Sequence, residues 1–92
     1  MARYTAAAWR GKQLFVGIDQ HRARWQVTVR TEEGLVLFRN AIAGNWPALR
    51  QVLEPYRGAG RIRAVYEAGY FGFGLYDQLQ AYGVEPLVTP RT

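Results

Sequence analysis

Two carboxylates stand apart among the seven acidic residues of this 92-residue chain. Asp19 ends the apolar stretch 14–18, and Glu67 ends the mostly apolar stretch 61–66. An isolated charge at the end of a buried strand loses its hydration, so each carboxylate needs a partner or a solvated position. For the other five, a solvated surface role is the simpler interpretation. These are Glu32 and Glu33 in a turn, Glu54 at a helix end, Asp77 inside a helix and Glu85 near an edge strand.

The chemistry of such a pair depends on how close the two groups lie. Two carboxylates held together repel, so one takes a proton or both share a cation. Mg²⁺ (or Mn²⁺) is suited to hard oxygen ligands, and phosphate oxygens can complete its shell. A pair of such ions about 4 Å apart can activate a nucleophile and stabilise the leaving oxygen of a phosphodiester. The residue types leave a structural alternative open, in which Asp19 caps the turn before His21 and Glu67 forms a salt bridge with Arg63 or Arg22.

The segments after the two carboxylates carry candidate nucleic-acid-binding residues. They are His21, Arg22 and Arg24 after Asp19, and Tyr70 after Glu67. Guanidinium groups suit phosphates, and an aromatic face can stack on a base. The competing interpretations are a surface turn for the histidine, a solvated face for the arginines and packing for the tyrosine. The run GYFGFG at 69–74 spaces its glycines as GxxGxG rather than GxGxxG, which disfavours dinucleotide binding.

Hydrophobic periodicity predicts the elements that position these residues. Strands are expected over 13–19, 25–30, 35–38, 61–67 and 84–88. A first helix is expected from its N-cap, Asn45, to the residue before Pro55. A second helix should run through Phe71, Leu75, Leu79 and Tyr82 and end at Gly83, its C-cap. The nearly continuous apolar run of 13–19 is typical of a central strand covered on both faces. Pro86 favours an edge position for the last strand.

The resulting order, β-β-β-α-β-α-β, predicts an α/β fold with a mixed sheet. Short links make the first three strands an antiparallel meander, and right-handed crossovers make the later strands parallel. This is the ribonuclease H-like order, without the later part of that fold. In open α/β sheets, ligands bind at the carboxyl ends of neighbouring strands. We therefore predict that Asp19 and Glu67 face each other across adjacent strands.

Composition narrows the class of partner. Twelve basic residues, eleven of them arginine, against seven acidic ones give a net charge of +5, which favours an anionic partner. The absence of cysteine excludes disulfides and thiolate metal sites. The first thirteen residues contain no long apolar run, so they predict neither a signal peptide nor a membrane span. We expect a cytoplasmic protein without a membrane partner.

Two segments resemble a known family. The stretches FVGIDQHRARWQVTV and YEAGYFGFGLYDQLQAYGVEPLVTP are similar to the amino-terminal part of the RuvC-like transposases of the IS-one-ten family of bacterial insertion sequences, which have an Asp-Glu-Asp-Asp site. The resemblance covers roughly 15–90. It implies a fold like that of Holliday-junction resolvases and Mg²⁺-dependent cutting and rejoining of DNA strands in a bacterial cytoplasm. Asp19 matches the first acidic residue and Glu67 the second, as catalytic and metal-binding groups.

The resemblance also predicts what this chain lacks. The other two aspartates and a participating serine of the family belong to later segments, so we expect 13–92 to be the amino-terminal part of the catalytic domain, preceded by a polar leader, 1–12. Such a chain should be inactive by itself. The implied partners are DNA, a structured guide RNA and, in the full-length protein, further copies of itself.

Two other functions stay open on the sequence. One is a nucleotide-binding half-domain of the actin and sugar-kinase type, which shares the sheet order and an aspartate on the first strand. That site requires a glycine and a hydroxyl residue after Asp19, where this chain has QHRAR. The other is a non-catalytic nucleic-acid-binding module that uses only the basic surface.

Overall fold

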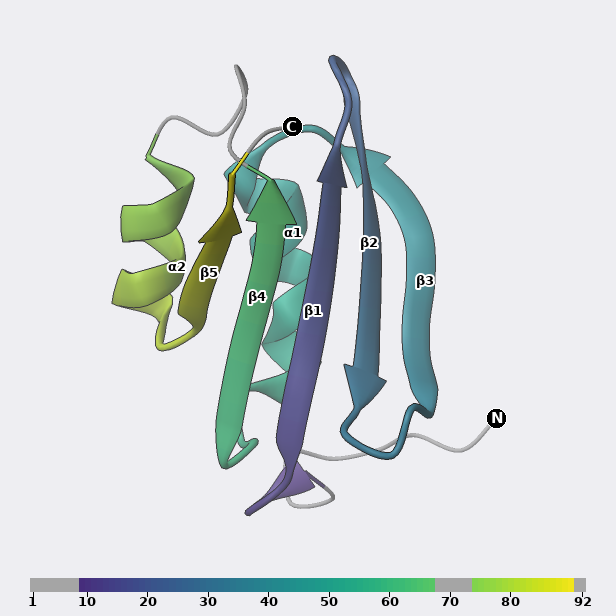
Figure 1. Ribbon diagram of the computed structural model, residues 1–92, viewed down its shortest axis with the longest axis vertical. Coiled ribbons are helices and arrows are strands. Elements are labelled where there is room, and N and C mark those ends of the chain that lie inside the picture. Colours follow the sequence, from purple (N-terminus) through teal and green to yellow (C-terminus); the bar gives the residue numbers. More distant parts are fainter. Residues whose placement is uncertain (1–8, 68–73, 91–92) are drawn as a thin grey trace.

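A five-stranded mixed sheet carries both α-helices of the described residues (Figure 1). The computed structural model describes residues 9–67 and 74–90. Its elements are β1 (Gln13–Gln20), β2 (Arg24–Thr31), β3 (Val36–Ala43), α1 (Trp46–Leu53), a short 3₁₀ helix η2 (Glu54–Tyr56), β4 (Arg61–Glu67), α2 (Leu75–Tyr82) and β5 (Glu85–Thr89). The predicted α/β class and the predicted succession of strands and helices are confirmed.

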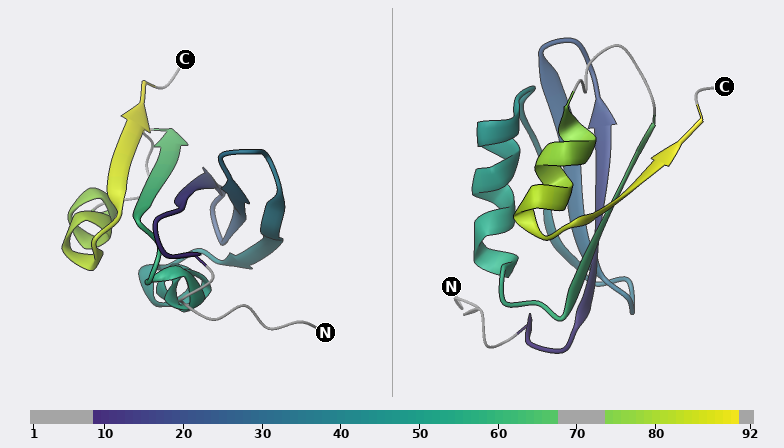
Figure 2. Two further views of the ribbon diagram at one scale, coloured as in Figure 1. Left: turned by 90° about the horizontal axis from the view of Figure 1, so that it is seen from below. Right: turned by 90° about the vertical axis from the view of Figure 1, so that its left-hand side faces the viewer.

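The sheet order is β3-β2-β1-β4-β5, with β1 in the centre. β2 is antiparallel to both β1 and β3, whereas β4 is parallel to β1 and to β5. The connections β3-α1-β4 and β4-α2-β5 both advance across the sheet in the same direction. Right-handed crossovers that advance in one direction place their helices on the same face. Figure 2 shows α1 and α2 side by side on one side of the sheet.

The hydrophobic core fills the space between the sheet and this helical layer. Alternate strand residues point into it, because successive side chains of a strand lie on opposite faces. The core members are Leu14, Val16 and Ile18 of β1, Trp25, Val27 and Val29 of β2, Ile62, Ala64 and Tyr66 of β4, Leu49 and Leu53 of α1, Leu75 and Leu79 of α2, and Trp9, Tyr56 and Val84. Trp9 lies within the segment predicted as a polar leader, and its ring centroid is 5.9 Å from that of Tyr56.

The prediction that β1 is covered on both faces is wrong for the described residues. Leu14, Val16 and Ile18 are buried beneath the helices, but Phe15 is only half-buried and Gly17 is exposed. The reason is the shared direction of the two crossovers, which places both helices of the described residues on one side of the sheet. We call that side the open face; it includes Phe15, Gly17 and Asp19 of β1 and Arg61, Arg63, Val65 and Glu67 of β4.

Helix limits follow the predicted capping residues. The Asn45 side chain accepts a hydrogen bond from the Ala48 backbone N–H at 2.9 Å, and Pro47 stands in the first turn of α1. Gly83 ends α2 with a left-handed φ of 94°. The predicted first residue of the second helix, Phe71, lies outside the described residues. No helix in the described part of the chain is long and apolar enough to cross a membrane.

The strand limits differ most at β3, which was predicted over 35–38 and extends to Ala43. The added residues, RNAIA, show no clear alternation by themselves, but they pair with β2, for example Ile42 with Trp25. Pairing with a neighbour therefore extends a strand that local pattern would end. β5 lies at the sheet edge as predicted, with Pro86 inside it.

The starts of β1 and β4 are held together at two glycines. The Gly60 backbone N–H donates to the Lys12 carbonyl at 3.0 Å, and a Cβ on Gly60 would lie 2.9 Å from backbone atoms of Gly11. We expect Gly60→Ala to lower the free energy of unfolding by about 1–3 kcal/mol, because backbone cannot yield as a flexible side chain does. Urea unfolding measures this. Gly17→Ala is the matched control, since its added Cβ meets nothing within 4 Å; equal stability losses in both variants would contradict the prediction.

Candidate functional site

The register between β1 and β4 brings Asp19 and Glu67 together. Ile18 pairs with Tyr66 in this parallel ladder, and the next residue along each strand is one of the two carboxylates. Neighbouring strands lie about 4.8 Å apart, so the two side chains start from adjacent backbone positions. The prediction that the carboxylates occupy neighbouring strands is confirmed.

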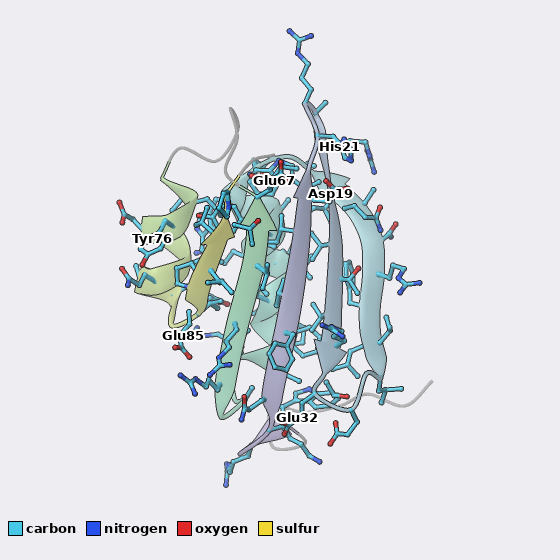
Figure 3. All side chains as sticks on the ribbon, in the orientation of Figure 1. Asp19, His21, Glu32, Glu67, Tyr76 and Glu85 are labelled. Carbon is cyan, nitrogen blue, oxygen red and sulfur yellow. The ribbon has the colours of Figure 1, made fainter. Side chains whose placement is uncertain are left out.

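Both carboxylates also lie on the open face. Ile18 and Tyr66 are buried beneath the helices, so the residues that follow them point to the opposite side of the sheet. Both acidic residues are exposed. Figure 3 shows the labelled Asp19 and Glu67 at the same end of the sheet, far from Glu32 at the other end. The arrangement is an open, solvated acidic pair at the carboxyl ends of β1 and β4.

The side chain of Asp19 contacts His21, a residue that the sequence placed in the following turn without predicting this contact. His21 Nε2 donates a hydrogen bond to Asp19 Oδ2 at 3.1 Å, and the two side chains are 68% and 72% exposed, respectively. The β1–β2 hairpin creates this contact, because the His21 backbone N–H donates to the Arg24 carbonyl at 3.0 Å and closes the turn. A side-chain contact so exposed contributes little to stability. It does orient one carboxylate oxygen of Asp19.

For Glu67, the structural alternative does not occur within residues 9–67 and 74–90. No ion pair there joins Glu67 to Arg63 or Arg22. Arg63 Nε instead lies 3.8 Å from a Glu85 oxygen, and Arg61 pairs with the same carboxylate, with its Nη2 3.0 Å from Oε1. The hydrogen bond from Arg61 lowers the pKa of Glu85. The arginines nearest in sequence to Glu67 are thus directed to another acid.

The predicted nucleic-acid-binding residues fall into two groups. His21, Arg22 and Arg24 are exposed in and beside the hairpin that follows Asp19. Arg24 Nη2 donates to the Ala41 carbonyl of β3 at 3.4 Å, a long hydrogen bond that links the hairpin base to the neighbouring strand. Tyr70 lies outside the described residues. The hairpin therefore carries a basic cluster directly next to Asp19, and the nucleic-acid-binding role of its residues stays a prediction.

The donor set at the acidic pair fits a hard cation in type. Carboxylate oxygens are the ligands that Mg²⁺ prefers, and Asp19 and Glu67 supply part of an octahedral shell. Across the described ranges, no group of three or more His, Cys, Asp or Glu side chains gathers where it could hold a metal ion. Further ligands would have to be water, phosphate oxygens or additional carboxylates.

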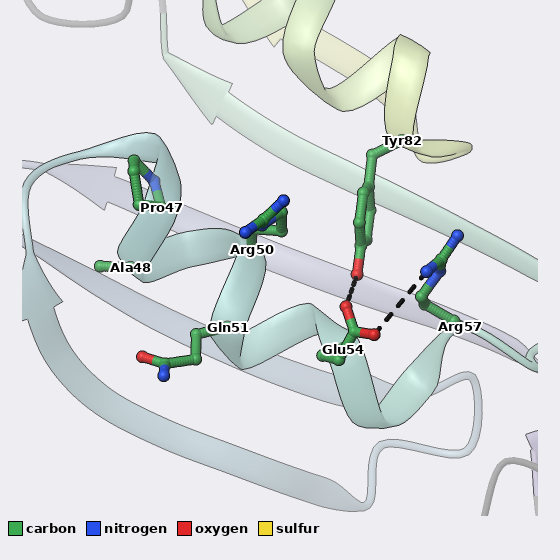
Figure 4. Close-up of a pocket in the computed structure, with 7 residues that line it drawn as sticks. All are labelled: Pro47, Ala48, Arg50, Gln51, Glu54, Arg57 and Tyr82. Atoms are coloured by element: carbon green, nitrogen blue, oxygen red, sulfur yellow. Dashed lines mark hydrogen bonds and ion pairs between the residues drawn. The ribbon is translucent and has the colours of Figure 1, made fainter.

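A concave region lies on the helical side, in a groove of about 680 Å³ between α1 and Tyr82 (Figure 4). Its acid, Glu54, accepts a hydrogen bond from the Tyr82 hydroxyl and lies 3.7 Å from Arg57. The Tyr82 hydrogen bond lowers the pKa of Glu54; burial, helped by that bond, raises the pKa of Tyr82 to about 12. Because Glu54 is paired with both Tyr82 and Arg57, we interpret this groove as a contact that joins η2, at the end of α1, to α2.

Sequence reasoning did not single out Phe15, Arg30 or Arg63, which the structure brings together on the open face. Phe15 pairs in register with Arg30 of β2 and with Arg63 of β4. The available signal was the period-two alternation of β2 and β4, in which Arg30 and Arg63 stand between buried residues.

Comparison with protein-family models and with curated proteins found no match to the chain.

Proposed function

We propose that this chain is part of a divalent-metal-dependent DNA transposase or nuclease of the RuvC-like type, in which Asp19 and Glu67 are two of the metal-binding carboxylates. The observation that carries the proposal is their position one residue beyond the Ile18–Tyr66 pair of adjacent parallel strands, on one face and at one end of the sheet. The order β3-β2-β1-β4-β5, with only β2 reversed, supports it, because this is the order of a ribonuclease H-like sheet.

Each residue of the site has a role in this proposal. The Glu67 carboxylate and the second oxygen of Asp19 hold the cation, while His21 orients Asp19 through its other oxygen. Arg22 and Arg24, on the adjoining hairpin, contact phosphates of the bound strand. When bound, Mg²⁺ or Mn²⁺ supplies Lewis-acid stabilisation of the charge that develops at phosphorus. The full activity requires the remaining carboxylates that the family resemblance implies.

The nucleotide-binding half-domain is supported less well. A phosphate-binding turn after the first strand uses backbone N–H groups of small residues and a hydroxyl side chain. Here the residues after Asp19 are QHRAR, and the His21 N–H in the turn is already bonded to the Arg24 carbonyl at 3.0 Å. The turn is therefore a closed hairpin with long basic side chains. That geometry favours contact with an extended polyanion over enclosure of a nucleotide phosphate.

Titration of the 92-residue chain with Mn²⁺, followed by the electron paramagnetic resonance signal of free Mn²⁺, tests the metal site. We expect weak binding with a dissociation constant on the order of 1 mM, about −4 kcal/mol, because the carboxylates are solvated and few. Asp19→Asn and Glu67→Gln should each weaken it at least about fivefold, since each removes one charged ligand.

Two matched substitutions serve as controls. Asp77→Asn, on α2 and so on the helical side of the sheet, and Glu32→Gln, at the far end of the sheet, remove the same charges from exposed positions. Circular dichroism confirms that every variant folds. If Mn²⁺ binding falls equally in the control and the site variants, the cation responds only to total charge and the proposal is wrong.

A further inference from the structure

Besides the acidic pair, the open face carries an aromatic residue between two arginines. Phe15 of β1 lies between Arg30 of β2 and Arg63 of β4, each directly opposite it in register. The guanidinium carbon of Arg30 is 5.7 Å from the Phe15 ring centroid. Phe15 is half-buried, so its ring belongs to the surface of the sheet. We call these three residues the arginine–phenylalanine row.

The row and the acidic pair are connected along the strands. Phe15 and Asp19 are four residues apart on β1, about 13 Å at the rise of a strand. Between them, Gly17 pairs with Thr28 on one side and Val65 on the other, and a Cβ added to Gly17 would meet nothing within 4 Å. Only small or medium side chains therefore line the surface between the arginine–phenylalanine row and the two carboxylates.

The charge of the open face favours an anionic occupant. Arg39 of β3 stands opposite Thr28, and Arg61 lies two residues before Arg63 on the same face. Glu85 is the acid near the row, and it is shared between Arg61 and Arg63. Arg30 and Arg39 form no ion pair with a described residue. Excess positive charge therefore remains on the open face beside Phe15.

An aromatic ring between two guanidinium groups suits one class of polyanion. Guanidinium groups bind phosphates, and an aromatic face stacks on an unpaired base whatever its identity. A double helix keeps its bases stacked inside, so it has none to place on Phe15. A protein partner that covered this face would bury the arginines, and desolvating them is costly without matching acids.

We propose that the open face binds a single-stranded nucleic-acid segment, with a base on Phe15 and phosphates at Arg30 and Arg63, and that the strand runs over Gly17 toward Asp19 and Glu67. This inference deepens the proposed function, since it names single-stranded nucleic acid as the form of substrate that reaches the acidic pair. The binding step itself needs no metal ion. It can therefore be tested without the proposed chemistry.

Fluorescence anisotropy of a short labelled oligothymidine, titrated with the 92-residue chain at low salt in EDTA, measures this binding. We expect Phe15→Leu to weaken binding about fivefold or more, because it keeps an apolar side chain but removes the stacking face. Arg30→Gln combined with Arg63→Gln should weaken it more than about tenfold and reduce the slope of log K against log salt by about 1.4, the value for two phosphate contacts to a single strand.

The control is Arg50→Gln combined with Arg57→Gln, which removes the same charge from exposed positions on the helical side. Equal losses in the two double variants would mean binding through total charge alone and would overturn the proposal. So would a Phe15→Leu variant that binds like the original chain. Self-association of the chain in analytical ultracentrifugation that Phe15→Leu abolishes would assign this face to a second copy instead.

The same measurement separates this inference from the proposed function. Asp19→Asn and Glu67→Gln should retain or strengthen oligothymidine binding in EDTA, because they remove negative charge near a bound strand. If they do so while Mn²⁺ binding proves independent of both carboxylates, the binding surface stands and the metal site fails. If the carboxylates bind Mn²⁺ but the row variants bind oligothymidine normally, the reverse holds.

Discussion

Asp19→Asn, in the complete transposase or nuclease to which we propose this chain belongs, is expected to reduce Mg²⁺-dependent DNA strand cleavage by a factor on the order of 10³, about 4 kcal/mol of transition-state stabilisation. The amide keeps the size of the side chain and can still contact His21, but it loses the negative charge that holds the cation. Initial rates on a supercoiled plasmid carrying the target sequence measure the effect.

Glu67→Gln should produce a loss of similar size, because the two carboxylates occupy equivalent positions on adjacent strands. Combining the two substitutions should cost little more than either alone, since residues that act as a unit are not additive. Glu32→Gln, at the far end of the sheet, is the control for charge and should leave the rate within about twofold, the range expected of a remote surface change. Cleavage that survives the double substitution would contradict the proposed function.

Leu53→Ala is expected to lower the free energy of unfolding by about 3 kcal/mol and the melting temperature by roughly 15 °C. Leu53 is the last residue of α1 and is 0% exposed within the core. The truncation leaves a cavity between the helix and the sheet, so the cost includes lost packing as well as lost apolar burial. Thermal unfolding followed by circular dichroism gives both quantities.

Leu35→Ala makes the same chemical change at a residue that is 61% exposed, in the turn before β3. It should alter stability by no more than about 0.5 kcal/mol, because a solvated leucine loses little burial. A drop as large as that of Leu53→Ala would contradict the arrangement of the core described above. Unfolding of both variants should remain a single transition, as expected for one small domain.

Local signals in the sequence were sufficient where they act on their own neighbours. Asn45 and Pro47 predicted the start of α1, and Gly83 predicted the end of α2, because caps and glycine φ angles depend on a few adjacent residues. Pro86 correctly predicted an edge strand, because proline has no backbone N–H to donate to a neighbouring strand. The end of β3 was missed because the pairing of RNAIA with β2 is not local.

The candidate acidic pair could also be predicted from the sequence. Sorting the acidic residues left Asp19 and Glu67 at the ends of two strand-like runs. Their position on adjacent strands was a prediction from the expected sheet order, and the parallel pairing of β1 with β4 bears it out. What the sequence could not supply was the contact between His21 and Asp19, which depends on how tightly the hairpin closes.

The succession of strands and helices, and the two acids that end the central strands, can be read from the amino-acid sequence because both depend on short-range patterns. Which face of the sheet is covered depends instead on how the elements pack. The nearly continuous apolar run of β1 does not distinguish its two faces, and the common direction of two crossovers placed both helices over Leu14, Val16 and Ile18. As a result, the half-buried Phe15 lies between Arg30 and Arg63 on the open face, which also carries the acidic pair. Strand register, which joins residues distant in the chain, is the physical reason that no local pattern revealed this surface.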